Sequence, residues 1–214
     1  SDAPTSTSIL GATKLTGRTA GGWVLGVLDA VTSRQFATVD SAGMRFRDEV
    51  EPLTNYAVLR AKRDFGGGAS SLGLMGTAVN RRIDDSRLDF LRTSAYAGGV
   101  DFSHRFSHNR YSLFAALGYS SIQGDTLAIQ AAQRSSARYY QRPDADYHTY
   151  DPTRTSLAGW NAALGFSRDQ GSTNYAVGFS ATSPGFEINH LGYQTRADRA
   201  TASVWVGHRW TRPG

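Results

Sequence analysis

The 214-residue sequence contains no cysteine, only two lysines (Lys14 and Lys62), and no apolar run as long as a membrane helix. The lack of cysteine excludes a disulfide framework and a thiolate metal site. The lack of an apolar run of about 18 residues excludes a transmembrane helix, but not strands that show lipid at every second residue. The net charge of +5 comes almost entirely from scattered arginines. A nucleic-acid-binding patch is therefore not expected.

A period of two in hydrophobicity is the strongest pattern that the sequence does contain. In the stretch 111–122, YSLFAALGYSSI, one face carries Tyr111, Leu113, Ala115, Leu117 and Tyr119, and the other is mostly small or polar. The same alternation recurs at 55–63, 70–78, 96–105, 159–168, 173–181 and 202–209, and less regularly at 8–16 and 22–32. Such alternation predicts about nine strands of about ten residues each.

The segments between the predicted strands alternate strictly between short and long. The short ones are 17–21, 65–69, 107–110 and 169–172, and the long ones are 33–54, 81–94, 123–156 and 183–197. Outer-membrane barrels have short periplasmic turns and longer extracellular loops, and a tilted strand of about ten residues crosses the apolar part of a bilayer. The sequence therefore predicts an all-β fold, an antiparallel transmembrane β-barrel in the bacterial outer membrane, in contact with the lipid bilayer and lipopolysaccharide.

A soluble β-barrel or sandwich is the alternative fold, in which the Leu, Phe and Tyr side chains point into a sealed core. This alternative explains the opposite face poorly, because that face is largely Gly, Ala and Ser. Exposed sheet faces in soluble proteins usually carry more Lys, Glu and Thr.

The loop pattern also predicts that the barrel is incomplete. It places residue 1 on the outer side and the end of the last strand, near Trp210, in the periplasm, whereas bacterial single-chain barrels have an even strand number and both termini in the periplasm. We therefore expect residues 1–214 to form a single β-barrel domain of about nine or ten strands. This domain would be a segment of a larger barrel that another segment or another chain completes.

Four stretches together resemble a known family. They are ILGATKLTGRTAGGWVLGVLDAVT (9–32), EVEPLTNYAVLRAKRDFGGGASSLGLMGTAVNR (49–81), YYQRPDADYHTYDPTRTSLAGW (139–160) and SPGFEINHLGYQTRAD (183–198). The sequence resembles the uncharacterised bacterial outer-membrane family in which a carbohydrate-binding-like domain of the family 9 type precedes a large β-barrel. The resemblance implies that this chain is an interior part of the barrel. It implies no particular activity.

The long outer loop at about 123–156 holds the first group of candidate site residues. Tyrosine rings can stack on sugar faces, and arginine and aspartate can bond hydroxyl groups. The candidates for binding a saccharide are Arg138, Tyr139, Tyr140, Arg142, Asp144, Tyr147, Tyr150, Asp151 and Arg154. The alternative is a loop packed on itself through Arg–Asp pairs and Tyr–Arg stacking. No metal site is expected, because Asp144, Asp146 and Asp151 match no calcium-loop spacing.

Charges on the predicted lumen side form the second group of candidates. They are Lys14, Arg60, Lys62, Asp101, Arg105 and Arg209. Charged rings in a pore tune its selectivity, and a net basic wall favours anionic solutes. A network of salt bridges that braces the barrel is the alternative role.

Catalysis has little support, because no HExxH, GxSxG or CxxC motif occurs. A hydrolase at the rim that uses Asp146, His148 and Asp151 is the only enzymatic alternative, and no cofactor is expected. The preferred function is passage or uptake of solutes, including saccharides by analogy with the family's accompanying domain. The alternative is a structural or interaction barrel with a plugged lumen, whose outer loops bind a partner protein or a surface ligand.

Overall fold

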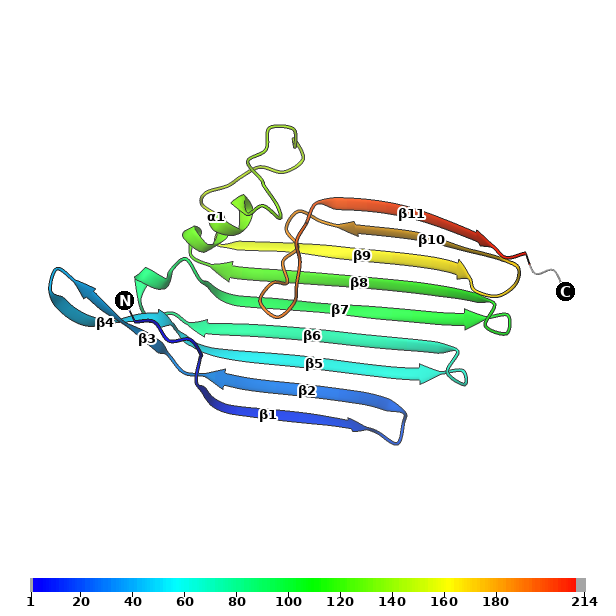
Figure 1. The fold of residues 1–214 in the computed structure, drawn as a ribbon, viewed down its shortest axis with the longest axis horizontal. Coiled ribbons are helices and arrows are strands. Elements are labelled where there is room, and N and C mark those ends of the chain that lie inside the picture. Colours follow the sequence, from blue (N-terminus) through cyan, green and yellow to red (C-terminus); the bar gives the residue numbers. More distant parts are fainter. Residues whose placement is uncertain (1, 211–214) are drawn as a thin grey trace.

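The computed structural model describes residues 2–210 as an all-β protein built on one nine-stranded antiparallel sheet (Figure 1). Its strands, in spatial order, are β1 (Ile9–Arg18), β2 (Trp23–Thr32), β5 (Leu53–Phe65), β6 (Ser70–Arg82), β7 (Arg92–Phe106), β8 (Tyr111–Gly124), β9 (Ser156–Arg168), β10 (Thr173–Thr182) and β11 (Arg199–His208). Every neighbour in this order is antiparallel. The nine strands predicted from the period of two are confirmed.

The alternation of connection lengths is also confirmed. The short turns span 19–22, 66–69, 107–110 and 169–172, and they gather at one end of the sheet, called here the turn end (Figure 1). Three consecutive glycines, Gly66–Gly68, take positive φ angles of 61° to 86° in one of these turns, a conformation that glycine adopts without strain. The long connections, at 33–52, 83–91, 125–155 and 183–198, gather at the opposite end, the loop end.

Three of the long connections contain regular structure that was not predicted from the sequence. The first folds into a separate hairpin, β3 (Gln35–Ser41) and β4 (Met44–Glu51), around Ala42 and Gly43, which both have positive φ. The segment 125–155, the helix loop, begins with α1 (Thr126–Arg134), and the Asp125 side chain caps this helix by accepting from the Leu127 N–H. A short helix, η1 (Ser86–Leu88), lies in a third connection. The predicted outer loop at about 123–156 therefore contains one helix.

The sheet is open, not closed into a barrel. β1 and β11 lie at its two edges, and among residues 2–210 neither has a strand partner on its outer side (Figure 1). The backbone groups on those two sides consequently remain available for pairing. The predicted fold is confirmed as an all-β antiparallel sheet, whereas closure of a barrel is not seen. No helix within residues 2–210 has the length and hydrophobicity needed to cross a membrane.

One face of the sheet, the apolar face, carries the side chains that the period of two groups together. Its central row follows the strand register through Leu25, Ala61, Leu74, Val100, Leu117, Ala162 and Ala181. Four large side chains of this face, Leu113, Leu117, Leu164 and Val177, are 39 to 61% exposed. Within residues 2–210 they do not form a sealed core.

The opposite face, the covered face, holds the core. Its central row runs through Lys62, Gly73, Asp101, Ala116, Ala163 and Ser180. Towards the loop end, the helix loop packs on this face and forms a cluster of buried residues, Val79, Ala95, Ile122, Ile129, Ala132, Tyr140 and Leu157. The core therefore lies between the sheet and its own loops, not between two sheets.

Candidate functional site

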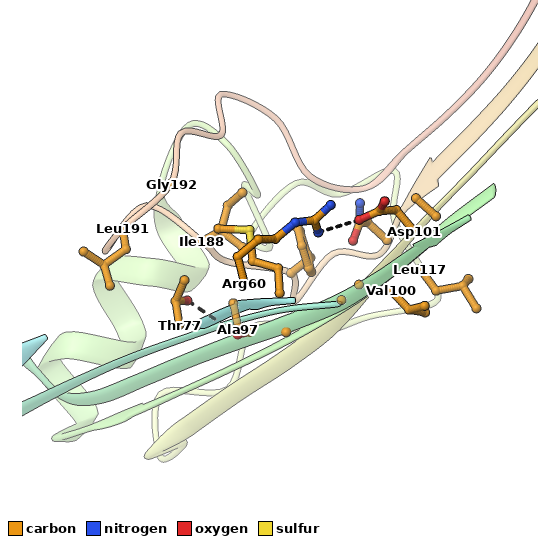
Figure 2. A pocket seen from close by; sticks show the side chains of 16 residues that line it. Arg60, Thr77, Ala97, Val100, Asp101, Leu117, Ile188, Leu191 and Gly192 are labelled. Carbon is orange, nitrogen blue, oxygen red and sulfur yellow. Dashed lines mark hydrogen bonds and ion pairs between the residues drawn. The ribbon is translucent and has the colours of Figure 1, made fainter. Parts of the chain in front are cut away.

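The connection from β10 to β11, residues 183–198, is called the strap because it folds back over the covered face (Figures 1 and 2). Its backbone lies almost directly on β9. A Cβ placed on Gly159 would lie 2.1 Å from the Phe186 nitrogen, and one on Gly185 would lie 2.1 Å from the Ala158 oxygen. These two glycines lack a side chain where the two backbones meet, and this allows the close approach.

A buried ion pair fixes the strap to the helix loop. The Arg138 guanidinium lies 2.9 Å from the Glu187 carboxylate, and the two side chains are only 1% and 3% exposed. Arg138 also donates to the Phe186 carbonyl oxygen. The Glu187 N–H donates to the Ser120 hydroxyl at 2.8 Å, and this bond links the strap to β8. Charge-assisted bonds of this kind are the strongest in a protein interior, so the strap has one defined position.

A second set of contacts joins the far end of the strap to the helix loop. Arg142 and the Tyr147 hydroxyl both donate to the Asp198 carboxylate, and the Ala197 N–H donates to the Ala137 oxygen at 2.8 Å. The hydrogen bond to Asp198 raises the pKa of Tyr147. The strap and the helix loop therefore act as one body on the covered face.

His190 of the strap lies among cationic groups. Its ring nitrogens lie 3.5 Å from Arg81 and 3.4 Å from Arg92. Burial, together with the neighbouring charges of Arg92 and Arg81, lowers the pKa of His190 to about 4. Glu187 is a nearby acidic group that opposes this shift. Docking of the strap is therefore coupled to the protonation of His190.

A cavity of about 290 Å³ lies beneath the strap (Figure 2). Ile188, Leu191 and Gly192 of the strap form its upper wall, and strands β5 to β9 form its floor. The floor is made largely of small residues, Thr77, Ala97, Gly99, Ala116 and Gly118, together with Met75. Small side chains on this face leave the space open between the sheet and the strap.

The Arg60–Asp101 ion pair provides the charges of this cavity. The guanidinium nitrogen lies 2.5 Å from the carboxylate oxygen, and the pair reaches from β5 to β7 across the intervening strand β6 (Figure 2). A Cβ on Gly73 of β6 would lie 2.5 Å from both partners, so a side chain at this position would force the pair to shift. The Asn161 side chain lies over Gly118 in the same way.

Five of the six predicted lumen charges share one face of the sheet, as the alternation requires. The register places Lys14, Arg60, Lys62, Asp101 and Arg105 on the covered face. Lys62 pairs with Asp64 at 3.4 Å. Arg209 follows β11 at the turn end, where its N–H donates to the Ser172 oxygen at 2.8 Å. Only Arg60 and Asp101 border the cavity, and the role of all six in selectivity stays a prediction.

Most of the nine candidate residues of the helix loop lie against other parts of the protein. Several have partners inside the protein: Arg138 and Tyr140 are buried, Arg142 binds Asp198, the Tyr150 hydroxyl donates to Gln130, and Asp151 accepts from Thr153 and lies 3.5 Å from Arg154. Tyr139 is exposed, and the exposed Asp144 lies 3.7 Å from Arg142. Tyr140, Tyr147 and Arg154 line a second cavity with His148 and Trp160, which were not among the nine candidates.

The strap was not predicted from the sequence to be part of a site. Phe186, Glu187, Ile188 and His190 come from a stretch without alternation or a catalytic motif. The only available signal was an apolar and charged stretch that follows a Pro-Gly turn in a long connection. Among residues 2–210, no group of three His, Asp or Glu side chains converges as metal ligands.

A comparison with known protein families identifies the family to which this chain belongs. The family described as "Domain of unknown function (DUF5916)" matches residues 1–214. The chain belongs to this family. No curated protein and no solved structure matches the chain. The DUF5916 match spans the sheet, the helix loop and the strap together, and it confirms the predicted resemblance as far as membership of a family of unknown function.

Proposed function

We propose that this chain forms part of the wall of a transmembrane β-barrel in the bacterial outer membrane, and that the barrel allows solutes to pass. The observation that carries the proposal is the exposed apolar face between two rows of aromatic side chains. Such an arrangement is typical of membrane barrels, whose outward apolar band lies between aromatic girdles.

The aromatic row at the turn end is nearly continuous. It contains Phe65, Phe102, His104, Phe106, Tyr111, Phe166 and Tyr175, whose neighbouring ring centroids lie 5.4 to 6.5 Å apart. Towards the loop end, Tyr96, Tyr119 and Trp160 occupy the same face on adjacent strands. Tyr111 and Tyr119 are eight residues apart on β8, which is about 27 Å along the strand. With a strand tilt of 35–45°, they would lie about 20 Å apart in height, close to the apolar band of about 25 Å.

The positions of the charged side chains on the apolar face agree with an apolar band that ends at the two aromatic rows. Within the nine strands they are Asp29, Arg63, Arg82 and Arg168, and each lies at an aromatic row or beyond it. Arg63 lies over the Trp23 ring, 5.9 Å from its centroid, at the turn end. Asp29 is the one acidic residue of these strands on this face. It lies in the same row across the sheet as Tyr96 and accepts a hydrogen bond from the Asn55 amide. A charge in the middle of the band would cost about 2–4 kcal/mol, and none of the described strand residues places one there.

In this arrangement, the covered face lines the lumen and the long connections are extracellular. A solute that moves along the covered face passes the Arg60–Asp101 pair and the small side chains of the floor. The resemblance described above suggests saccharides as the solutes, a suggestion based on family analogy.

The plugged-lumen alternative also has an observation in its favour. The strap and the helix loop pack tightly on the covered face and are anchored by the buried Arg138–Glu187 pair. If they fill the lumen of the intact barrel, the protein is a scaffold whose outer surface binds a partner. The two functions make opposite predictions for conductance.

Membrane placement can be tested with two tryptophans that lie on opposite faces of the sheet and have similar exposure. Trp160 lies on the apolar face and is 51% exposed, whereas Trp205 lies on the covered face and is 59% exposed. Two variants are compared in vesicles, each of which keeps one of these tryptophans and has the others replaced by phenylalanine. Brominated lipid should quench Trp160 strongly and Trp205 weakly. Equal quenching of the two would refute the lipid-facing assignment.

Passage of solutes is tested by conductance in planar bilayers. We expect open-channel currents from the protein, and a shift of the reversal potential towards cation selectivity for Arg60→Gln relative to the conservative Arg60→Lys. If the protein inserts correctly but gives no current and no swelling of sugar-loaded vesicles, passage is excluded and the scaffold function is supported.

A further inference from the structure

A third cavity, of about 370 Å³, lies on the covered face between the end of the strap and the last two strands of the sheet. Strands β10 and β11 form its floor, and the end of the strap forms its side. Two guanidinium groups and four hydroxyl groups converge on it, those of Arg196, Arg199, Ser180, Thr182, Thr195 and Thr201. No residue of this cavity borders the cavity beneath the strap, so it is a separate site.

The register of β10 and β11 gathers the polar groups of the floor. Ser180 is directly opposite Thr201, and Thr182 is directly opposite Arg199. Side chains that are directly opposite in an antiparallel pair have Cβ atoms about 5 Å apart, and next neighbours on one face of a strand are about 7 Å apart. Three hydroxyls and one guanidinium therefore lie within reach of a single small molecule.

Hydrogen bonds hold the end of the strap beside this floor. The Gln194 amide donates to the carbonyl oxygens of Phe186 and Arg196, each at 3.1 Å, and the Gln194 N–H donates to the Asn189 side chain at 2.7 Å. These bonds fix the backbone that carries Thr195 and Arg196. The cavity is thus formed before a ligand arrives, and this reduces the entropic cost of binding.

The polar groups of this cavity are accessible to a ligand. Thr195, Arg196 and Arg199 are exposed, and neither arginine forms an ion pair within residues 2–210. Asp198, the acidic residue next to Arg199 in the sequence, is bound by Arg142 instead. No carboxylate lines the cavity, so its two positive charges are not compensated from inside the protein.

The chemistry of the lining selects the ligand class. A phosphate monoester carries a charge of about −1.5 to −2 at pH 7 and three acceptor oxygens, which two guanidinium groups match in charge and geometry. The hydroxyls both donate to and accept from sugar hydroxyls. The Tyr193 ring, which lines the same cavity and is 86% exposed, offers an apolar surface suited to the C–H face of a sugar.

We propose that this cavity binds a phosphorylated saccharide, with the phosphate on the two arginines and the sugar on the hydroxyls. Only the location of the cavity in the lumen rests on the proposed function. Binding itself requires neither passage of the ligand nor an open lumen.

Binding can be measured by titration calorimetry on the detergent-solubilised protein, with glucose 6-phosphate, glucose and inorganic phosphate as probes. We expect saturable binding of glucose 6-phosphate, at least tenfold tighter than that of either other probe, because only this ligand uses both parts of the site. Arg199→Gln should weaken binding at least tenfold, and Thr201→Val at least threefold. The matched controls are Arg18→Gln and Thr16→Val, on the covered face of the other edge strand, and they should bind as the unmodified protein does.

A further arm identifies the source of the ligand, because phosphorylated sugars occur both free and in lipopolysaccharide. Binding of purified lipopolysaccharide that Arg199→Gln weakens tenfold, without binding of glucose 6-phosphate, supports the site and assigns it to the lipid-linked sugar. The proposal is overturned if neither ligand binds, or if glucose 6-phosphate binds no tighter than glucose or inorganic phosphate. It is also overturned if Arg199→Gln and Thr201→Val, with unchanged circular dichroism, bind as tightly as the unmodified protein. Because no current is measured, these outcomes are independent of the solute-passage test.

Discussion

Replacing Arg138 by methionine removes one partner of the buried ion pair and leaves the Glu187 carboxylate in the interior. Loss of one member of such a pair costs about 3–5 kcal/mol, because the remaining charge is desolvated without compensation. Arg92, 3.9 Å from Glu187, offers partial compensation, so the cost of Arg138→Met should fall near the lower limit, about 3 kcal/mol.

The reverse substitution, Glu187→Met, should cost more. It leaves the guanidinium groups of Arg81, Arg92 and Arg138 close together without the carboxylate that offsets them. We therefore expect a cost near the upper limit of the range, about 5 kcal/mol. The double variant Arg138→Met/Glu187→Met removes both charges and should be more stable than either single variant.

Amide hydrogen exchange of the strap measures this free energy directly, because local opening exposes these amides. Since about 1.4 kcal/mol corresponds to a factor of ten, protection at Phe186 and Glu187 should fall about 140-fold for Arg138→Met and about 4,000-fold in the Glu187→Met variant. Arg196→Met is the control, because this arginine is an exposed residue of the same strap. Protection within threefold of the unmodified protein in both single variants, or a double variant less protected than either, would refute the proposed anchoring role.

Three further predictions concern the covered face. Gly159→Leu places a side chain where the strap backbone lies, so limited trypsin digestion should cut the strap at least tenfold faster than in the unmodified protein. Gly73→Val should separate Arg60 from Asp101, and in a double-mutant cycle of urea unfolding its effect should not add to that of Asp101→Asn; additive effects would contradict the contact. Because docking lowers the pKa of His190 to about 4, strap protection should be constant above about pH 6.5 and fall as the pH drops towards 4, whereas His190→Gln should remove this fall.

The sheet could be predicted from the sequence because a strand's faces are set by local chemistry. Alternating residues of one strand point to opposite faces, so Leu113 and Leu117 of β8 had to share one face, and Arg60 and Lys62 of β5 had to share another, whatever the tertiary fold. The β3–β4 hairpin was missed although the Ala42–Gly43 turn and the alternation on both sides of it were local signals.

The candidate site could be predicted only in part. Tyr140, Tyr147 and Arg154 were identified by composition, since aromatic and charged side chains are concentrated in their loop. His148 and Trp160 complete the same cavity, but their proximity follows from how the helix loop packs against β9, which no spacing in the sequence encodes.

The sequence by itself determined the strands, their two faces and the alternation of short turns with long connections, because these follow from residue-by-residue geometry and hydrophobicity. Only the tertiary structure decided that the strap lies on the covered face and that Arg138 meets Glu187, 49 residues away. Such contacts depend on two loops that pack against each other in the folded protein. In the same way, Gly159 is required because the strap backbone packs directly against it, and the sequence of β9 alone does not show this contact.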